Sequence, residues 1–241
     1  MSHASLPAAV PVAASPRVAG LLAAADGPLE VVHRGPDAVY VALGGEPGDR
    51  AVGVLSRAAV PVPCGLRSRL AEVPDGRAVV AGGVLHLGGV PLPVARLVDV
   101  RVPRIDPALV RPGTLDLADV DRLVGLGPGL TPYGDDVLCG WLAVHRAAGI
   151  ATDEVDARVG ALAGRTTLLS ATLLDCAVRG EVVPAFGVWL AALETPREAA
   201  AADAVLAVGA SSGAGLLAGA ALALGRRSSV DVDDGIGRIA A

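Results

Sequence analysis

The sequence predicts an α+β protein in which a β-rich region, residues 1–115, is followed by a mostly α-helical region, residues 116–241. Two observations support this division. Fourteen of the 18 prolines lie in the first region, and proline interrupts helices. The formal charge is +2 in the first region, with 11 arginines against 9 acidic residues, and −7 in the second, with 9 against 16. Two regions of different architecture are therefore expected.

The first region contains short valine-rich runs separated by turn residues, which is typical of strands. Residues 50–54 and 98–102 alternate between polar and apolar side chains, which favours an antiparallel sheet or a small barrel with one solvated face. Residues 103–115 contain three prolines and predict a stiff connection. The predicted strands are residues 29–33, 37–43, 51–55, 77–81, 84–87 and 94–102.

The second region contains longer runs with helical spacing of apolar residues. Two of them begin with threonine followed by proline, Thr131-Pro132 and Thr195-Pro196, which predicts a hydroxyl N-cap before a first-turn proline. The acidic tail, residues 231–241, is predicted to be a loosely held end. The predicted helices are residues 116–124, 132–148, 153–163, 166–179, 184–193, 196–208 and 212–224.

Residues 204–225 carry no formal charge, and this length would suffice to cross a membrane. Ser211-Ser212-Gly213 falls in the middle, where a serine N-cap and a glycine predict two shorter helices of a soluble core instead. The first fifteen residues lack the basic segment of a signal peptide. Three cysteines without C-x-x-C spacing suit a reducing compartment, so we expect a cytoplasmic protein with no membrane partner.

The composition excludes several functions. The chain has no lysine, asparagine or glutamine, so a Schiff-base lysine, a pyridoxal-phosphate anchor and the lysine of a P-loop are all impossible. Aromatic residues make up 2% of the chain and the net charge is −5, which argues against a nucleic-acid partner. A polar site must therefore use arginine, acidic residues, hydroxyls, a few histidines and backbone N–H groups.

The densest candidate site is the glycine-rich loop of residues 125–136, which reads GLGPGLTPYGDD. Its three glycines at alternate positions let backbone N–H groups approach a ligand, and the following helix N-terminus favours an anion. We expect Gly127, Gly129 and Leu130 to donate backbone N–H groups to a small carboxylate or phosphate, and Thr131 to cap the helix. The loop has neither the lysine of a P-loop nor the glycine spacing of a dinucleotide site.

The loop ends in two aspartates, Asp135 and Asp136, which are the candidate catalytic residues. Two carboxylates would repel an anion unless a cation lies between them, and one solution is a Mg²⁺ ion held by these aspartates and by substrate oxygens. Another is that one aspartate orients the substrate or acts as a general base. A third is that both only complement the helix dipole.

Two later segments could complete such a pocket. In the first, Arg165 precedes a helix face on which Thr166 and Ser170 lie four residues apart, so hydroxyls and a guanidinium could hold a carboxylate or phosphate. In the second, Ser212 and Gly213 lie at another glycine-serine entrance to a helix. Both segments also fit ordinary helix starts and close packing, so both interpretations stay open.

The three segments together resemble the family that includes the small subunit of oxamate carbamoyltransferase. The shared motifs are GLGPGLTPxGDD at 125–136, RTTxxS at 165–170, AxxG at 177–180 and GxxSG at 209–213. The resemblance covers residues 125–219. It implies a subunit that acts with larger carbamoyltransferase subunits in anaerobic allantoin degradation, where oxalurate and phosphate are interconverted with oxamate and carbamoyl phosphate.

Two positions depart from the family pattern: Tyr133 replaces a small serine, and Gly215 stands where an acidic residue is expected. These changes imply a bulkier pocket wall and a missing carboxylate. The leading hypothesis is a subunit of a carbamoyltransferase assembly that binds a small anion, of the oxamate, oxalurate or carbamoyl phosphate class. The alternatives are a non-catalytic assembly or regulatory subunit, and a stand-alone metal-assisted hydrolase or lyase.

Overall fold

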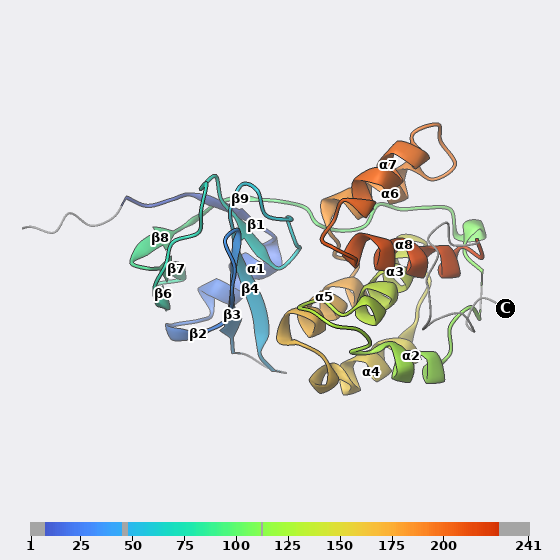
Figure 1. Ribbon diagram of the computed structural model, residues 1–241, viewed down its shortest axis with the longest axis horizontal. Helices are drawn as coiled ribbons and strands as arrows, with labels where there is room; N and C mark the ends of the chain where they lie inside the picture. The colour runs from blue at the N-terminus through green and yellow to red at the C-terminus, as the bar shows by residue number, and fades with distance from the viewer. Residues whose placement is uncertain (1–7, 45–47, 112, 227–241) are drawn as a thin grey trace, which may run out of the picture. The chain divides into compact units, whose positions relative to one another are not determined.

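The computed structural model describes residues 8–44, 48–111 and 113–226. The chain forms two compact units, residues 1–99 and residues 100–241. Within the described residues, all nine strands lie in the first unit, and helices make up most of the second (Figure 1). The predicted α+β class is therefore confirmed, with the β-rich part first.

The first unit is a nine-stranded sheet with the order β8-β7-β6-β2-β3-β4-β5-β1-β9. Its pairs are antiparallel except for β4–β5 and β1–β9, which are parallel. The two ends of this order, β8 and β9, are consecutive in the chain and separated only by Pro93, so the sheet is nearly closed on itself. The strands are β1 (Val12–Ala14), β2 (Gly27–Arg34), β3 (Ala38–Leu43), β4 (Arg50–Leu55), β5 (Gly65–Arg67), β6 (Ala78–Ala81), β7 (Val84–Leu87), β8 (Val90–Leu92) and β9 (Val94–Leu97).

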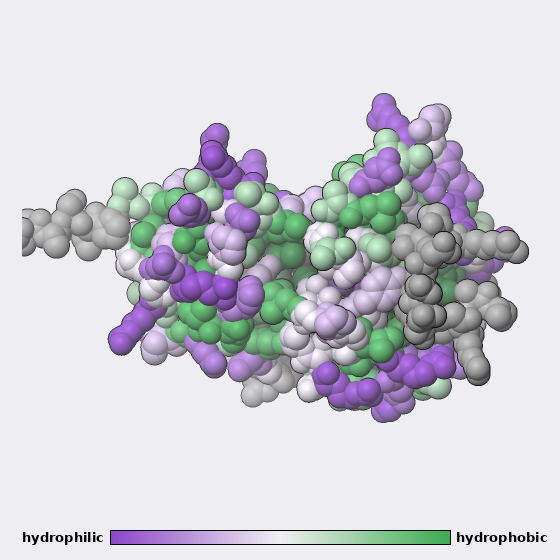
Figure 2. Space-filling view, viewed as in Figure 1, coloured by the Kyte–Doolittle hydropathy of each residue, from purple (hydrophilic) through white to green (hydrophobic). Residues whose placement is uncertain are grey.

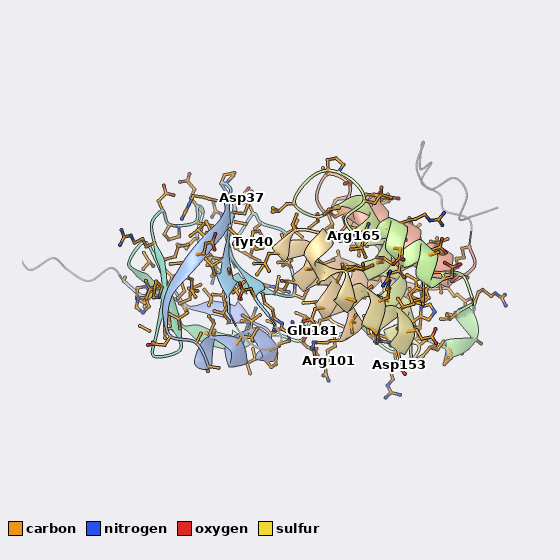
Figure 3. All side chains as sticks on the ribbon, turned by 90° about the horizontal axis from the view of Figure 1, so that it is seen from below. Asp37, Tyr40, Arg101, Asp153, Arg165 and Glu181 are labelled. Carbon is orange, nitrogen blue, oxygen red and sulfur yellow. The ribbon has the colours of Figure 1, made fainter. Side chains whose placement is uncertain are left out.

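Five of the six predicted strands are confirmed as β2, β3, β4, β6 and β7. The sixth, residues 94–102, is correct only as far as Leu97. The Val98 N–H still donates to the Ala14 carbonyl of β1, at 2.9 Å. From residue 100 the run belongs to the second unit, where Val100 and Val102 form backbone hydrogen bonds with residues 180–182, and Arg101 forms an isolated bridge with Glu181 (Figure 3). The alternation in residues 100–102 therefore reflects pairing with a segment that follows a helix.

Four elements of the first unit were not predicted: the short strands β1, β5 and β8, and helix α1 (Pro16–Ala23). The helix begins after Ser15, whose hydroxyl accepts a hydrogen bond from the Val18 N–H, and a proline occupies its first turn. Its buried residues Val18 and Leu22 pack into the core of the sheet. The N-terminal segment therefore closes the core of the strand unit.

The second unit contains all seven predicted helices. They are α2 (Leu117–Leu123), α3 (Tyr133–Ala147), α4 (Asp153–Ala161), α5 (Leu168–Val178), α6 (Pro184–Ala192), α7 (Glu198–Leu206) and α8 (Ser212–Ala223), with single 3₁₀ turns η1 (Pro107–Leu109) and η2 (Ala163–Arg165). Helix α3 is the central one, because 13 of its 15 residues are buried and α2, α5 and α8 all pack against it. Its first turn lies at the candidate loop.

Glycines bring α3 and α8 unusually close together. A Cβ atom at Gly140 would lie 2.0 Å from the Leu216 carbonyl oxygen, and one at Gly219 would lie 1.8 Å from the Val137 carbonyl oxygen. No side chain fits at either position. Small residues therefore allow the close approach of this helix pair.

The uncharged stretch 204–225 is divided between α7 and α8, as predicted. Within the described ranges, no helix combines the length and the apolar character that a membrane crossing requires. The first seven residues and the acidic tail at 231–241, on which two further predictions depend, lie outside the described residues.

The predicted N-cap at Thr195 is wrong. Helix α7 begins two residues later than expected, at Glu198, and its N-cap residue is Arg197. The Thr195 hydroxyl instead donates a hydrogen bond to the Ala192 carbonyl and accepts one from the Arg197 N–H, at 3.2 Å. Pro196 therefore belongs to a turn that precedes the helix.

Candidate functional site

Asp135, in the first turn of α3, is a buried acceptor that organises the loop. Asp135 is 1% exposed, and both of its carboxylate oxygens accept hydrogen bonds. Oδ1 accepts the Gly125 N–H at 2.8 Å, and Oδ2 accepts the Ser170 hydroxyl at 2.6 Å and the Thr166 hydroxyl. One carboxylate thus joins the glycine-rich loop to the start of α5. The structure thus brings Asp135, Thr166 and Ser170 together, and the hydroxyls of Thr166 and Ser170 both donate to Asp135.

Backbone packing fixes the entrance of the loop. Gly125 has a φ of 76°, and a Cβ atom there would lie 2.5 Å from the Arg165 carbonyl oxygen. A Cβ atom at Gly134 would lie 2.1 Å from the Leu123 carbonyl oxygen. Glycine is therefore required at Gly125 for its positive φ and for the close approach, and at Gly134 for the close approach.

Thr167 is a residue that sequence reasoning did not assign to the site. Its hydroxyl donates to the Leu130 carbonyl at 2.6 Å and accepts the Ser170 N–H at 3.0 Å, which makes Thr167 the N-cap of α5. The same side chain thus caps a helix and holds the loop. The threonine three residues before Ser170 was the available signal for the cap, whereas the bond to Leu130 joins residues 37 apart and has no local signal.

The loop keeps a set of backbone donors free. In the described part of the chain, the N–H groups of Gly127, Gly129, Leu130, Thr131 and Tyr133 donate no hydrogen bond. Gly127 and Gly129 are exposed, and both have positive φ angles, 109° and 100°. These donors lie where the chain enters the N-terminus of a fifteen-residue helix, which is the kind of position that binds anions.

The predicted capping role of Thr131 is wrong. The N-cap of α3 is Pro132, which makes no side-chain capping bond, and the Thr131 hydroxyl instead pairs with the Ser212 hydroxyl at 2.9 Å. Since Ser212 is the first residue of α8, this pair joins two helix N-termini. Gly213 is a packing residue, because a Cβ atom there would lie 1.9 Å from the Val205 carbonyl oxygen.

Asp136 differs sharply from its neighbour. It is 5% exposed, and its Oδ2 atom is buried without a hydrogen-bond partner among the described residues. Burial raises the pKa of Asp136 to about 7, the Ser212 hydroxyl opposes this shift, and the charge of Asp135 adds to it. Asp136 is therefore a buried ionisable group with one oxygen that has no hydrogen-bond partner among the described residues.

Tyr133 lies beside Asp136 in the same turn. Its hydroxyl oxygen is also buried without a partner in the described residues, and burial together with the Asp136 charge raises the pKa of the hydroxyl. A Cβ atom at Gly215 would lie 2.6 Å from the Asp136 Cβ and 3.4 Å from Cδ2 of the Tyr133 ring. The acidic side chain expected at position 215 has no room here.

Arg165 contributes to the site through its backbone. Its carbonyl packs on Gly125, while its exposed side chain makes no hydrogen bond to either loop aspartate among the described residues. The pKa of Asp121 is lowered mainly by its hydrogen bonds to Arg158, and the charge of Arg165 adds to this effect. The charge of Arg165 therefore acts on Asp121 in α2. Figure 2 shows hydrophilic residues over α2 and α4.

Fewer carboxylate oxygens of the two aspartates are available for a metal ion than the sequence predicts. Among the described residues, no group of three or more histidine, cysteine or acidic side chains is arranged to hold a metal ion. Both oxygens of Asp135 already accept protein hydrogen bonds, whereas Oδ2 of Asp136 is free. A Mg²⁺ ion at the two aspartates stays a prediction, with Asp136 as the residue that has an oxygen available.

The fold and the site define a class: a two-unit α+β protein whose helical unit carries a glycine-rich loop at the N-terminus of a buried helix. Residues 123–224 match the family model described as oxamate carbamoyltransferase subunit AllH, so this segment of the chain is similar to that family. The resemblance found from the three motifs is thereby confirmed. The match runs from the end of α2 to the end of α8 and contains every candidate site residue. Neither the curated proteins nor the solved structures contain a match.

Proposed function

We propose that the helical unit binds a small oxygen-rich anion, of the oxamate, oxalurate or carbamoyl phosphate class, at residues 125–136. We further propose that the chain acts as one subunit of an oxamate carbamoyltransferase-like assembly with larger partner subunits. The observation that carries the proposal is the set of free backbone N–H groups at the start of α3, inside the segment that matches the family.

In this proposal the loop residues have separate tasks. The N–H groups of Gly127, Gly129 and Leu130 bind anionic oxygens, and the dipole of α3 adds to their effect. Asp135 holds the loop in its binding conformation through its bonds to Gly125, Thr166 and Ser170. Because these donors are fixed before the ligand arrives, binding costs little conformational entropy.

The two aspartates do not exclude an anion from this helix terminus. The charge of Asp135 is compensated by three hydrogen-bond donors. With a pKa of about 7, Asp136 is protonated in a large fraction of molecules near neutral pH, and the protonated form does not repel an anion. A Mg²⁺ ion bound by Asp136 and by ligand oxygens is the alternative way to balance the charge.

A pair of matched glycine substitutions tests the binding site. Gly129 and Gly149 both have positive φ angles, 100° and 70°, and a Cβ atom at either position would meet nothing within 4 Å. Both Gly129→Ala and Gly149→Ala therefore introduce backbone strain without a clash. We expect Gly129→Ala to weaken oxamate or carbamoyl phosphate binding about tenfold or more, and Gly149→Ala to leave it unchanged, as measured by calorimetry. Equal affinities for the two variants would contradict the proposal.

The assembly role needs a separate experiment. Co-purification of the tagged chain from its native host, followed by a carbamoyl-transfer assay, should yield larger subunits and transfer activity. A non-catalytic subunit is the alternative that the glycine-mediated packing of α3 and α8 favours. It predicts a complex in which Gly129→Ala changes neither ligand affinity nor transfer, whereas a stand-alone hydrolase or lyase would show turnover in the purified single chain.

A further inference from the structure

Two buried polar atoms that have no partner among the described residues lie in the same turn of α3: the Tyr133 hydroxyl oxygen and Asp136 Oδ2. The two residues are three positions apart, so their side chains lie on the same face of the helix. The two groups also interact electrostatically, because the charge of Asp136 raises the pKa of the Tyr133 hydroxyl. Gly215 faces both residues and has no side chain that could reach either atom.

Such a pair is unusual in a folded protein. A buried donor or acceptor without a partner destabilises the folded state, and most buried polar atoms therefore have a hydrogen-bond partner. Among the described residues only one other buried side-chain atom lacks a partner, Nε of Arg67 in the strand unit. These two unpaired atoms lie beside the loop with its free N–H groups. This indicates that a ligand group supplies their missing hydrogen bonds.

The chemistry of the two groups selects the ligand. A tyrosine hydroxyl keeps its proton at neutral pH and can donate a hydrogen bond, while Asp136 in its ionised form can only accept. A donor and an acceptor side by side complement a carbonyl oxygen next to an N–H group. A primary carboxamide or a ureido group presents these two atoms in one plane, whereas a carboxylate presents two acceptors.

We propose that Tyr133 and Asp136 recognise a carboxamide or ureido group of the ligand, with the Tyr133 hydroxyl donating to its carbonyl oxygen and Asp136 Oδ2 accepting its N–H. The loop N–H groups then bind the adjacent anionic group. This inference rests on the proposed function, since it takes the anion site at residues 125–136 as given. It adds that the ligand must combine an anion with an amide, and it makes Tyr133, which replaces the serine of the family pattern, a specificity residue of this chain.

Three acids of nearly equal size and shape test the recognition: oxamate, pyruvate and oxalate. They carry, beside the same carboxylate and carbonyl, an NH₂ group, a CH₃ group and an anionic oxygen. Calorimetry on the full-length chain near pH 7.5 should show oxamate binding about tenfold or more tightly than pyruvate, which has no N–H to donate. Oxalate should bind most weakly, because its second carboxylate faces Asp136.

Two variants separate the donor from the acceptor. Tyr133→Phe should weaken oxamate and pyruvate in parallel, by about five- to thirtyfold, because both ligands lose the bond to their carbonyl oxygen. Asp136→Asn should lower the ratio of oxamate to oxalate affinity by about tenfold or more, since an amide no longer repels oxalate and can donate to it. Tyr40→Phe in the strand unit and Asp203→Asn on the exposed face of α7 are the matched controls, and they should change neither affinity nor ratio.

The outcomes distinguish the two proposals. Binding of all three acids with affinities within about threefold would overturn the amide recognition and leave the anion site intact. A ratio unchanged by Asp136→Asn, or an oxamate affinity unchanged by Tyr133→Phe, would also overturn it, and would indicate that ordered water satisfies the two atoms. Failure of all three acids to bind the wild-type chain would contradict the proposed function itself.

Discussion

At the scale of single residues, the two adjacent aspartates have opposite environments. Asp135 is saturated by three donors, while Asp136 is buried with one oxygen free. The sequence pattern GDD marks both as site candidates but cannot rank them. The difference depends on hydroxyls 31 and 35 residues further along the chain, and on which oxygen of each carboxylate they reach. Only the folded arrangement shows that both oxygens of Asp135 accept protein hydrogen bonds, whereas Oδ2 of Asp136 has no partner among the described residues.

The environment of Asp136 makes stability depend on pH. Burial raises its folded-state pKa from 3.8 to about 7, so the unfolded chain loses this proton at lower pH than the folded one. The free energy of unfolding should therefore fall as pH rises through that window and level off above pH 7, by about 2–4 kcal/mol for this group. In Asp136→Asn this component is absent, so the variant should gain stability over the wild type as pH rises. Urea unfolding at several pH values between 4 and 8 measures the difference.

Tryptophan fluorescence suits this measurement, because both tryptophans of the chain, Trp141 and Trp189, lie in the helical unit. Two groups coupled to Asp136 do not titrate in this pH range, because the pKa values of the Tyr133 hydroxyl and of the buried Cys139 thiol are both raised above their ordinary values. Asp203→Asn, at an exposed position, should show the pH profile of the wild type. Parallel profiles for Asp136→Asn and the wild type would mean that the carboxyl titrates normally.

At the scale of elements, helical patterns in the sequence predict all seven α-helices described in the second unit, but they do not predict where each helix begins and ends. Thr131 and Thr195 carry the local signal of an N-cap, yet one pairs with a hydroxyl 81 residues away and the other belongs to a turn. The strands β1, β5 and β8 have three residues each, which is too short for an alternation to be recognised. Their existence depends on neighbours that are distant in the sequence, such as the pairing of Ala13 with Arg67.

The contact between α3 and α8 gives a prediction at this scale. In Gly219→Ala the new methyl group would overlap the Val137 carbonyl, so the helices must move apart, and we expect a loss of about 3 kcal/mol or more in the free energy of unfolding. Gly160→Ala is the matched control, because Gly160 is an exposed helical glycine and a Cβ atom there would meet nothing within 4 Å. There alanine should stabilise α4 by about 0.5–1 kcal/mol. Equal effects in denaturant unfolding would show that the helices are not in close contact.

At the scale of the whole molecule, composition and proline distribution predict the order of the two regions, and the family match lies within the second. The near closure of the sheet could not be predicted, because it requires β8 and β9, adjacent in the chain, to lie at opposite ends of the strand order. Likewise, the pattern VDVRV at residues 98–102 is that of one strand, but Val98 bonds to β1 while residues 100–102 pair with residues 180–182 of the helical unit.

The division into two compact units implies that the helical unit folds by itself. We expect a fragment comprising residues 100–241 to unfold cooperatively, with a fluorescence-detected midpoint within about 5 °C of the full chain, a shift equivalent to about 1 kcal/mol. It should retain the oxamate affinity of the full chain, because the loop and all its hydrogen-bond partners lie within it. A fragment without a cooperative transition would show that the strand unit is needed for folding.

Gly215 and Tyr133, the two positions that depart from the family pattern, lie close together in the structure. A Cβ atom at this position would lie 2.6 Å from the Asp136 Cβ and 3.1 Å from the Tyr133 carbonyl oxygen, beside the tyrosine ring. A large side chain at 133 and a large side chain at 215 therefore compete for one volume between α3 and α8. A large side chain at 215 would meet the Tyr133 ring, so we expect a large side chain at only one of these two positions.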